Sequence, residues 1–112
     1  SSEDLRKLTI GSILAIDADI IIFDEPTNTL DENEIKDLFK IILELKELNK
    51  TVILISHDTF LSWKYSERII LLREGQVVAD KSKNETFKDE KLLESCNITV
   101  PIESKIYSHI YS

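Results

Sequence analysis

Two adjacent carboxylates, Asp24 and Glu25, follow four apolar residues (20–23) and precede Pro26. A continuous apolar run of this kind predicts a strand that is buried on both faces, as in a parallel sheet. Parallel sheets bind ligands at the carboxyl ends of their strands. Because successive side chains point to opposite faces, one carboxylate can serve a metal ion while the other serves a water molecule. Two strand-end acids without a role are the alternative, which the cost of burying an unpaired carboxylate disfavours.

His57 follows a second apolar stretch, residues 51–56, in the same way. Between the two stretches, apolar residues at helical spacing predict a helix from 32 to about 48, with Asp31 as N-cap and Glu34 completing a capping box. Strand, helix and strand form a right-handed βαβ unit with parallel strands. His57 and the two acids are then expected at one edge of the sheet. A structural, half-buried histidine is the alternative, and the neighbouring acids favour a functional one.

The order of three segments resembles the C-terminal half of an ATP-binding cassette (ABC) ATPase. Residues 20–27 are similar to its Walker B strand, residues 28–31 to its D-loop, and residues 53–58 to its switch-histidine strand. The resemblance implies an α/β fold, namely a partial P-loop NTPase-like parallel sheet with flanking helices that lacks the Walker A half. It covers nearly all of this chain and about half of the family's cassette.

The resemblance also implies roles for the matching residues. Asp24 is expected to hold Mg²⁺ through a bound water, because magnesium keeps much of its hydration shell. Glu25 is expected to act as general base or to orient the attacking water. His57 is expected to contact the γ-phosphate of ATP, and Asp31 to couple two ATPase subunits across a dimer. The expected cofactors are therefore ATP and Mg²⁺.

The first residues are similar to the signature segment of the family, Leu-Ser-Gly-Gly-Gln or a close variant, only in part. A count back from Asp24 puts Ser1 on the signature serine, Ser2 and Glu3 on the two glycines, and Asp4 on the glutamine. The missing glycines matter because glycine lets a backbone approach a phosphate closely. Ser1 is therefore either a phosphate contact or a plain helix N-cap.

The phosphate-cradling loop of the family, G-x-x-x-x-G-K-[ST], does not occur in this sequence, which has two glycines, Gly11 and Gly75. We therefore expect this chain alone neither to bind ATP tightly nor to hydrolyse it. Without the other half of the cassette, a sheet edge and an apolar helix face should be uncovered. Such surfaces pair with other chains, so we expect self-association and unusual packing around residues 20–23.

Residues 1–112 are predicted to be one C-terminal fragment of a nucleotide-binding domain with three parts. Residues 1–16 form the signature segment and a helix over 3–16, whose buried stripe comprises Leu5, Leu8, Ile13 and Ile16, broadened by Leu14 and Ala15. Residues 17–80 hold the Walker B, D-loop and switch-histidine segments and a hairpin. Residues 81–112 form a helical extension, in which Ile102, Ile106, Tyr107 and Ile110 could line one side of a last helix.

The composition of the chain limits the kinds of partner that it can bind. The chain has 14 basic and 21 acidic residues, a formal net charge of −7, which argues against a nucleic-acid binder. The single cysteine, Cys96, precludes an internal disulfide and suits a reducing cytosol. No apolar run has the roughly 18 residues of a spanning helix, so membrane association is expected to go through a partner. Because the chain lacks methionine, it is interpreted as a piece of a longer product.

The leading interpretation is an ATP-hydrolysing subunit, in fragment, of an ABC importer of a small solute such as a metal ion or vitamin. It would lie at the cytoplasmic face of the membrane, with transmembrane subunits and a second ATPase subunit, identical or different, as partners. The segment from Tyr65 to Phe87 resembles transporter cassettes, and the tail resembles cobalt-type or energy-coupling-factor importers. Two alternatives stay open. One is a soluble translation or DNA-repair ATPase, of which Thr27-Asn28 is reminiscent. The other is a non-catalytic half-cassette that acts as an interaction module.

Overall fold

The computed structural model describes residues 2–99, which fall into two compact units. The boundary between the units along the chain lies between Ser56 and His57. The first unit contains α1 (Ser2–Ala15), β1 (Ile20–Asp24), α2 (Glu32–Glu47) and β2 (Thr51–Ile55). The second contains α3 (Thr59–Tyr65), β3 (Arg68–Arg73), β4 (Gln76–Ser82), α4 (Lys83–Lys88) and α5 (Glu90–Ser95). The predictions for Ser1 and for a helix through Ile102, Ile106, Tyr107 and Ile110 lie outside the described residues.

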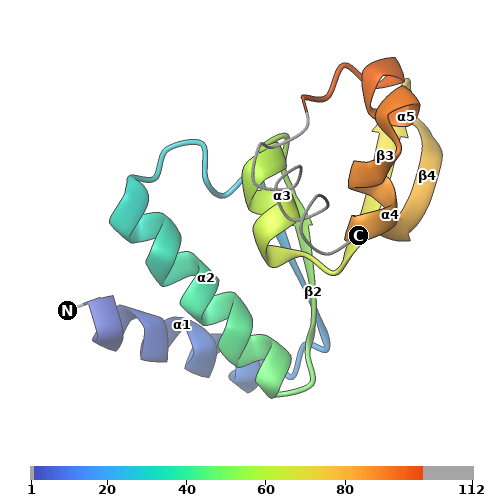
Figure 1. Cartoon of the computed structure of the whole chain (residues 1–112). Coiled ribbons are helices and arrows are strands. Elements are labelled where there is room, and N and C mark those ends of the chain that lie inside the picture. The colour runs from blue at the N-terminus through green and yellow to red at the C-terminus, as the bar shows by residue number, and fades with distance from the viewer. Residues whose placement is uncertain (1, 100–112) are drawn as a thin grey trace. The chain divides into compact units, whose positions relative to one another are not determined.

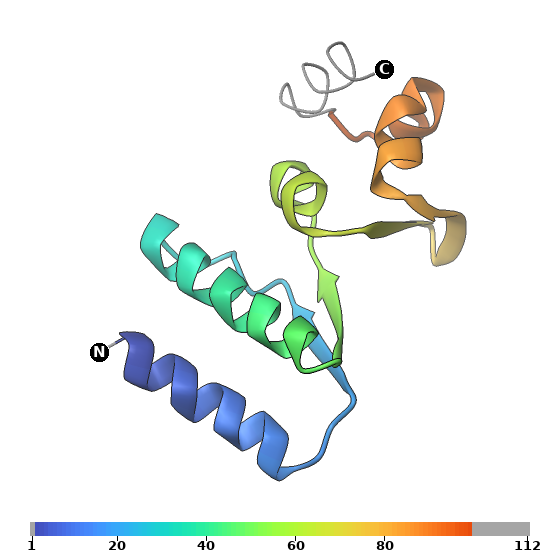
Figure 2. The same ribbon diagram turned by 60° about the horizontal axis from the view of Figure 1, so that its bottom comes forward.

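The predicted βαβ arrangement is confirmed in the first unit. Strands β1 and β2 are parallel neighbours, with Ile20 opposite Thr51 and Asp24 opposite Ile55. Helix α2 connects them and packs against β2, while α1 packs against α2 (Figure 1). The turned view in Figure 2 also shows α1 and α2 side by side. Helix α2 therefore packs on one face of the two-stranded sheet, and α1 packs on α2.

Helix α2 begins and ends at the residues that its sequence predicts. The carboxylate of Asp31 caps its first turn, and Asn49, with a left-handed backbone (φ 60°), follows its last turn. The amide of Lys50 then donates to the carbonyl of Leu45 over 3.0 Å, which satisfies a carbonyl that the helix end leaves free. Its buried side chains form the core of the first unit: Phe39, Ile42 and Leu45.

The expectation that β1 and β2 are buried on both faces is wrong for this chain. Their side chains alternate between half-buried and exposed. The exposed ones include Ile20 and Ile22, each 59% exposed, and Ile53 and Ile55, at 44% and 46%. The physical reason is that helices of the first unit pack on one face only. These four isoleucines, which we call the open sheet face, form an apolar surface.

The predicted buried stripe of α1 is also wrong. Leu5, Leu8 and Ile16 are 64%, 68% and 74% exposed, and the helix ends at Ala15, one residue before the prediction. Ile10 is the buried residue instead, and Arg6 pairs with Glu44 of α2 through Nε and Oε1, 3.0 Å apart. Apolar residues lie on several sides of α1, so periodicity alone could not tell which side meets α2.

The second unit is the predicted hairpin with two short helices packed on it. Strands β3 and β4 are antiparallel, with a register shift at Leu71 and a turn in which Glu74 and Gly75 both have positive φ. Helices α4 and α5 lie beside this hairpin (Figure 1). Its core comprises Ile69, Phe87 and Leu93, with Trp63, Leu71 and Ile98 packed against it. Among the described residues no helix is both long enough and apolar enough to cross a membrane.

Candidate functional site

The two carboxylates at the end of β1 have different surroundings. Asp24 is exposed and lies on the same face of β1 as Ile20 and Ile22. Glu25 is half-buried, and its Oε2 oxygen is shielded from solvent. The backbone amide of Glu25 donates to the carbonyl of Ile55 over 2.8 Å, so the β1–β2 ladder continues one residue beyond Asp24. Adjacent acids therefore present one accessible carboxylate and one sheltered carboxylate, an arrangement suited to two different tasks.

His57 is exposed and is the first residue of the second unit. It follows Ile55, the residue that pairs with Asp24, by two positions along the chain. The next residue, Asp58, caps α3 by accepting the amide of Leu61 over 3.0 Å. The strand end therefore leads directly through His57 into a helix, and the contact of His57 with a γ-phosphate stays a prediction.

Asp31 uses its carboxylate within its own helix. Its Oδ1 accepts the amide of Glu34 over 2.8 Å, and its own amide donates to Oε1 of Glu34 over 3.4 Å. The predicted capping box is thereby confirmed. The box fixes where the loop of residues 25–30 joins α2. The role of Asp31 in coupling two subunits stays a prediction.

We expect Asp31→Ala to lower the free energy of unfolding of the first unit by about 1 kcal/mol, because the amide of Glu34 loses its acceptor. Asp31→Ser should keep most of the stability, since a serine hydroxyl can accept the same amide. Urea denaturation followed by circular dichroism measures both variants. An equal loss for alanine and serine would show that the missing acceptor is not what lowers the stability.

The exposed carboxylate of Asp24 fits the way proteins hold Mg²⁺. Within residues 2–99, no three His, Cys, Asp or Glu side chains gather into a metal cage. Magnesium does not need such a cage, because it is commonly bound by one or two carboxylates together with water and substrate phosphates. When bound, the ion would neutralise phosphate charge. The sequence has no glycine-rich phosphate loop, so this chain does not contain the loop that would cradle those phosphates.

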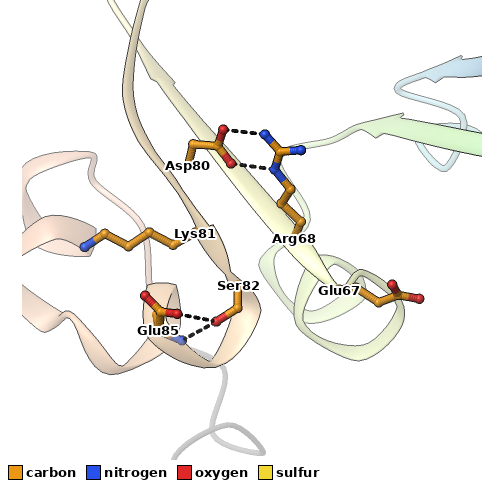
Figure 3. Close-up of a pocket in the computed structure, with 6 residues that line it drawn as sticks. All are labelled: Glu67, Arg68, Asp80, Lys81, Ser82 and Glu85. Atoms are coloured by element: carbon orange, nitrogen blue, oxygen red, sulfur yellow. Dashed lines mark hydrogen bonds and ion pairs between the residues drawn. The ribbon is translucent and has the colours of Figure 1, made fainter.

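A shallow pocket of about 520 Å³ in the second unit is a structural feature that the sequence did not predict (Figure 3). Two of its charged residues, Arg68 and Asp80, form an ion pair. Arg68 Nε donates to Asp80 Oδ1 over 2.6 Å and Nη2 donates to Oδ2, and these hydrogen bonds lower the pKa of Asp80. Glu85 bonds to Ser82, whereas Glu67 and Lys81 point away. We interpret the Arg68–Asp80 pair in this pocket as a cross-strand contact that stabilises the hairpin, and not as a binding site.

The fold of this chain is that of part of an ABC ATPase domain. It is similar to the solved structure of cbiO1 from Clostridium perfringens, described as part of the ABC transporter complex cbiONQ. The TM-score is 0.62 at 26% identity, over 88% of this chain and 40% of that one. It is also similar to MJ1267, an ATP-binding cassette of an ABC transporter, with a TM-score of 0.64 at 26% identity over 84% and 39% of the two chains.

The homologues of the chain are energy-coupling factor and other ABC transporter ATP-binding proteins. It is 34% identical over 102 residues to EcfA2 of Methanospirillum hungatei, covering 91% of this chain and 26% of the relative. It is 39% identical over 102 residues to EcfA2 of Staphylococcus aureus, covering 90% and 36%. The chain thus spans about a quarter to a third of the length of these curated relatives. No family model matches it.

Proposed function

We propose that this chain is the part of an ABC importer ATPase that supplies the water-activating side of the ATP site. The observation that carries the proposal is the strand end at which the exposed carboxylate of Asp24 and the sheltered carboxylate of Glu25 follow each other. The relatives named above support it, because EcfA2 is an energy-coupling factor transporter ATP-binding protein. The cargo would be a small solute, such as a metal ion or a vitamin.

Each predicted residue has a role in this proposal. Asp24 would hold a hydrated Mg²⁺, which when bound would supply positive charge to offset that of the phosphates. Glu25 takes a proton from the attacking water or orients it, and His57 contacts the γ-phosphate. Asp31 couples two ATPase subunits, and Ser1, which lies outside the described residues, is either a phosphate contact or a helix cap. In this proposal the chain itself does not supply the glycine-rich phosphate cradle.

The proposal includes two kinds of partner. A transmembrane subunit would receive the force of ATP-driven closure, and a second ATPase subunit would complete the dimer. The subunit would then lie at the cytoplasmic face of the membrane. The named relatives are transporter proteins, which favours this proposal over a translation or repair ATPase.

A chimera tests the ATPase part of the proposal. This chain would replace the 102 matched residues of S. aureus EcfA2, so that the rest of that protein supplies the remaining parts of the cassette. ATP hydrolysis by the chimera, lost on Glu25→Gln, is the expected result. A folded chimera that binds ATP but does not hydrolyse it would refute the proposed role.

Cell fractionation tests the transporter part. An antibody against the 12.9 kDa chain would be used on membrane and soluble fractions of its native cells. A larger band in the membrane fraction is expected for a transporter ATPase. A larger band that stays soluble would point to a translation or repair ATPase. A band at the mass of the chain itself would point to a half-cassette that acts as an interaction module.

We also propose that the isolated chain associates with itself through the open sheet face. We expect Ile22→Lys together with Ile53→Lys to yield a monomer, because the two residues are paired neighbours on this face and a lysine pair repels its counterpart. Leu43→Lys, on the exposed side of α2, is the matched control. Light scattering of the unaltered chain that shows a 12.9 kDa monomer at high concentration would contradict the proposal.

A further inference from the structure

The backbone of Glu25 is left-handed (φ 47°). Its position relative to helices and strands differs from that of every other left-handed residue among residues 2–99. Three of the others lie two residues after the last residue of a helix: Asp17, Asn49 and Asn97. Glu74 and Gly75 form the hairpin turn. These positions are the usual ones for left-handed residues. Glu25 instead follows the last residue of a strand, so neither a helix end nor a hairpin explains its conformation.

Two steric effects oppose this conformation. Every residue except glycine meets a clash between Cβ and the following carbonyl oxygen in the left-handed region, and glutamate lacks the short polar side chain with which Asn and Asp offset it by local hydrogen bonds. Glu25 also precedes Pro26, whose ring favours an extended backbone at the residue before it. Such strain persists only where surrounding contacts enforce it, and it gathers at functional sites.

The contacts that enforce it come from the neighbouring strand and the following loop. The amide of Glu25 donates to the Ile55 carbonyl over 2.8 Å, which ties the residue to the end of β2. On the other side, the carbonyl of Glu25 accepts the amide of Asn28 over 3.5 Å, and the capping box of Asp31 fixes the far end of the loop. Both peptide groups of Glu25 are thereby held.

We propose that β2, through the Ile55 carbonyl, holds Glu25 in this strained conformation in order to position its carboxylate. The inference rests on the proposed role of Glu25 in hydrolysis. An extended residue at position 25 would simply continue the strand alternation, whereas the left-handed backbone redirects the chain just after Asp24. The Oε2 of Glu25 is sheltered while Asp24 remains exposed. The strain lowers stability in exchange for the placement of one catalytic group.

The chain contains a matched control for this strain. Glu74 is also a glutamate with a left-handed backbone (φ 52°), but it lies in the hairpin turn of the second unit. Aspartate keeps the charge and tolerates a left-handed backbone better than glutamate. We therefore expect Glu25→Asp and Glu74→Asp each to raise the Tm of the 112-residue chain, by about 2–6 °C. A rise for Glu74→Asp without one for Glu25→Asp would overturn the proposal.

The two variants should differ in activity when placed in the EcfA2 chimera. Glu25→Asp shortens the carboxylate by one methylene, so we expect kcat to fall by about 10²-fold with the KM for ATP unchanged. Glu74→Asp should leave both constants unchanged. An unchanged kcat for Glu25→Asp would overturn the positioning role. A chimera that folds and binds ATP but does not hydrolyse it would refute the proposed function and any catalytic purpose of the strain, while the Tm comparison still decides whether the strain exists.

Hydrogen exchange checks the Ile55 contact without any substitution. The Glu25 amide should exchange at least tenfold more slowly than an unstructured amide, because it is bonded to the Ile55 carbonyl. Exchange at the unstructured rate would show that β2 does not hold Glu25, and the proposal would fail.

Discussion

Glu25→Gln should lower the rate of ATP hydrolysis by the EcfA2 chimera by about 10²–10⁴-fold, the usual contribution of a general base. Glutamine has nearly the same shape as glutamate, but it cannot take a proton from water. ATP binding should persist, because the carboxylate acts on the water and not on the nucleotide. A coupled assay of phosphate release gives the rate, and fluorescent-nucleotide titration gives the affinity.

Glu47→Gln provides the matched control for this experiment. Glu47 is an exposed glutamate at the end of α2, so the same chemical change there should leave the rate unchanged. A hydrolysis rate that survives Glu25→Gln would refute the assignment of the whole site. A rate that falls equally in both variants would mean that loss of negative charge, and not loss of the base, slows the reaction.

Leu45→Ala should lower the free energy of unfolding of the first unit by about 2–5 kcal/mol. Leu45 is 0% exposed in α2, so its truncation removes apolar contacts and leaves a cavity that the surrounding side chains fill only in part. This loss is a large share of the stability of a small domain and could unfold the unit at 37 °C. Urea denaturation monitored by circular dichroism measures it.

Leu43→Ala is the control on the same helix. Leu43 is 51% exposed, so we expect its truncation to change the free energy of unfolding by no more than about 0.5 kcal/mol. The two variants share residue type and helix and differ in burial. Similar losses for both would show that α2 is packed differently from the structure described above, with its presently exposed side also covered.

Local sequence determined the elements and their ends. The strand before Asp24, the capping box of Asp31 and Glu34, and the hairpin each depend on a few neighbouring residues, and the structure confirms each of them. The order of the three segments at the strand ends was also enough to show a resemblance to ABC ATPases, and the homologues confirm this resemblance. Features of this kind depend on residues that are close together in the chain, so they can be predicted from the sequence alone.

Tertiary structure decided which apolar surfaces are covered. The run from Ile20 to Phe23 looked buried on both sides, yet the first unit packs helices on one face of its sheet only. Helix α1 buries Ile10 instead of Leu5 or Leu8. The left-handed backbone of Glu25 could not be read from the sequence either, and the residue that accepts its amide, Ile55, lies thirty residues later. Burial and strain depend on residues distant in sequence, so only the folded chain reveals them.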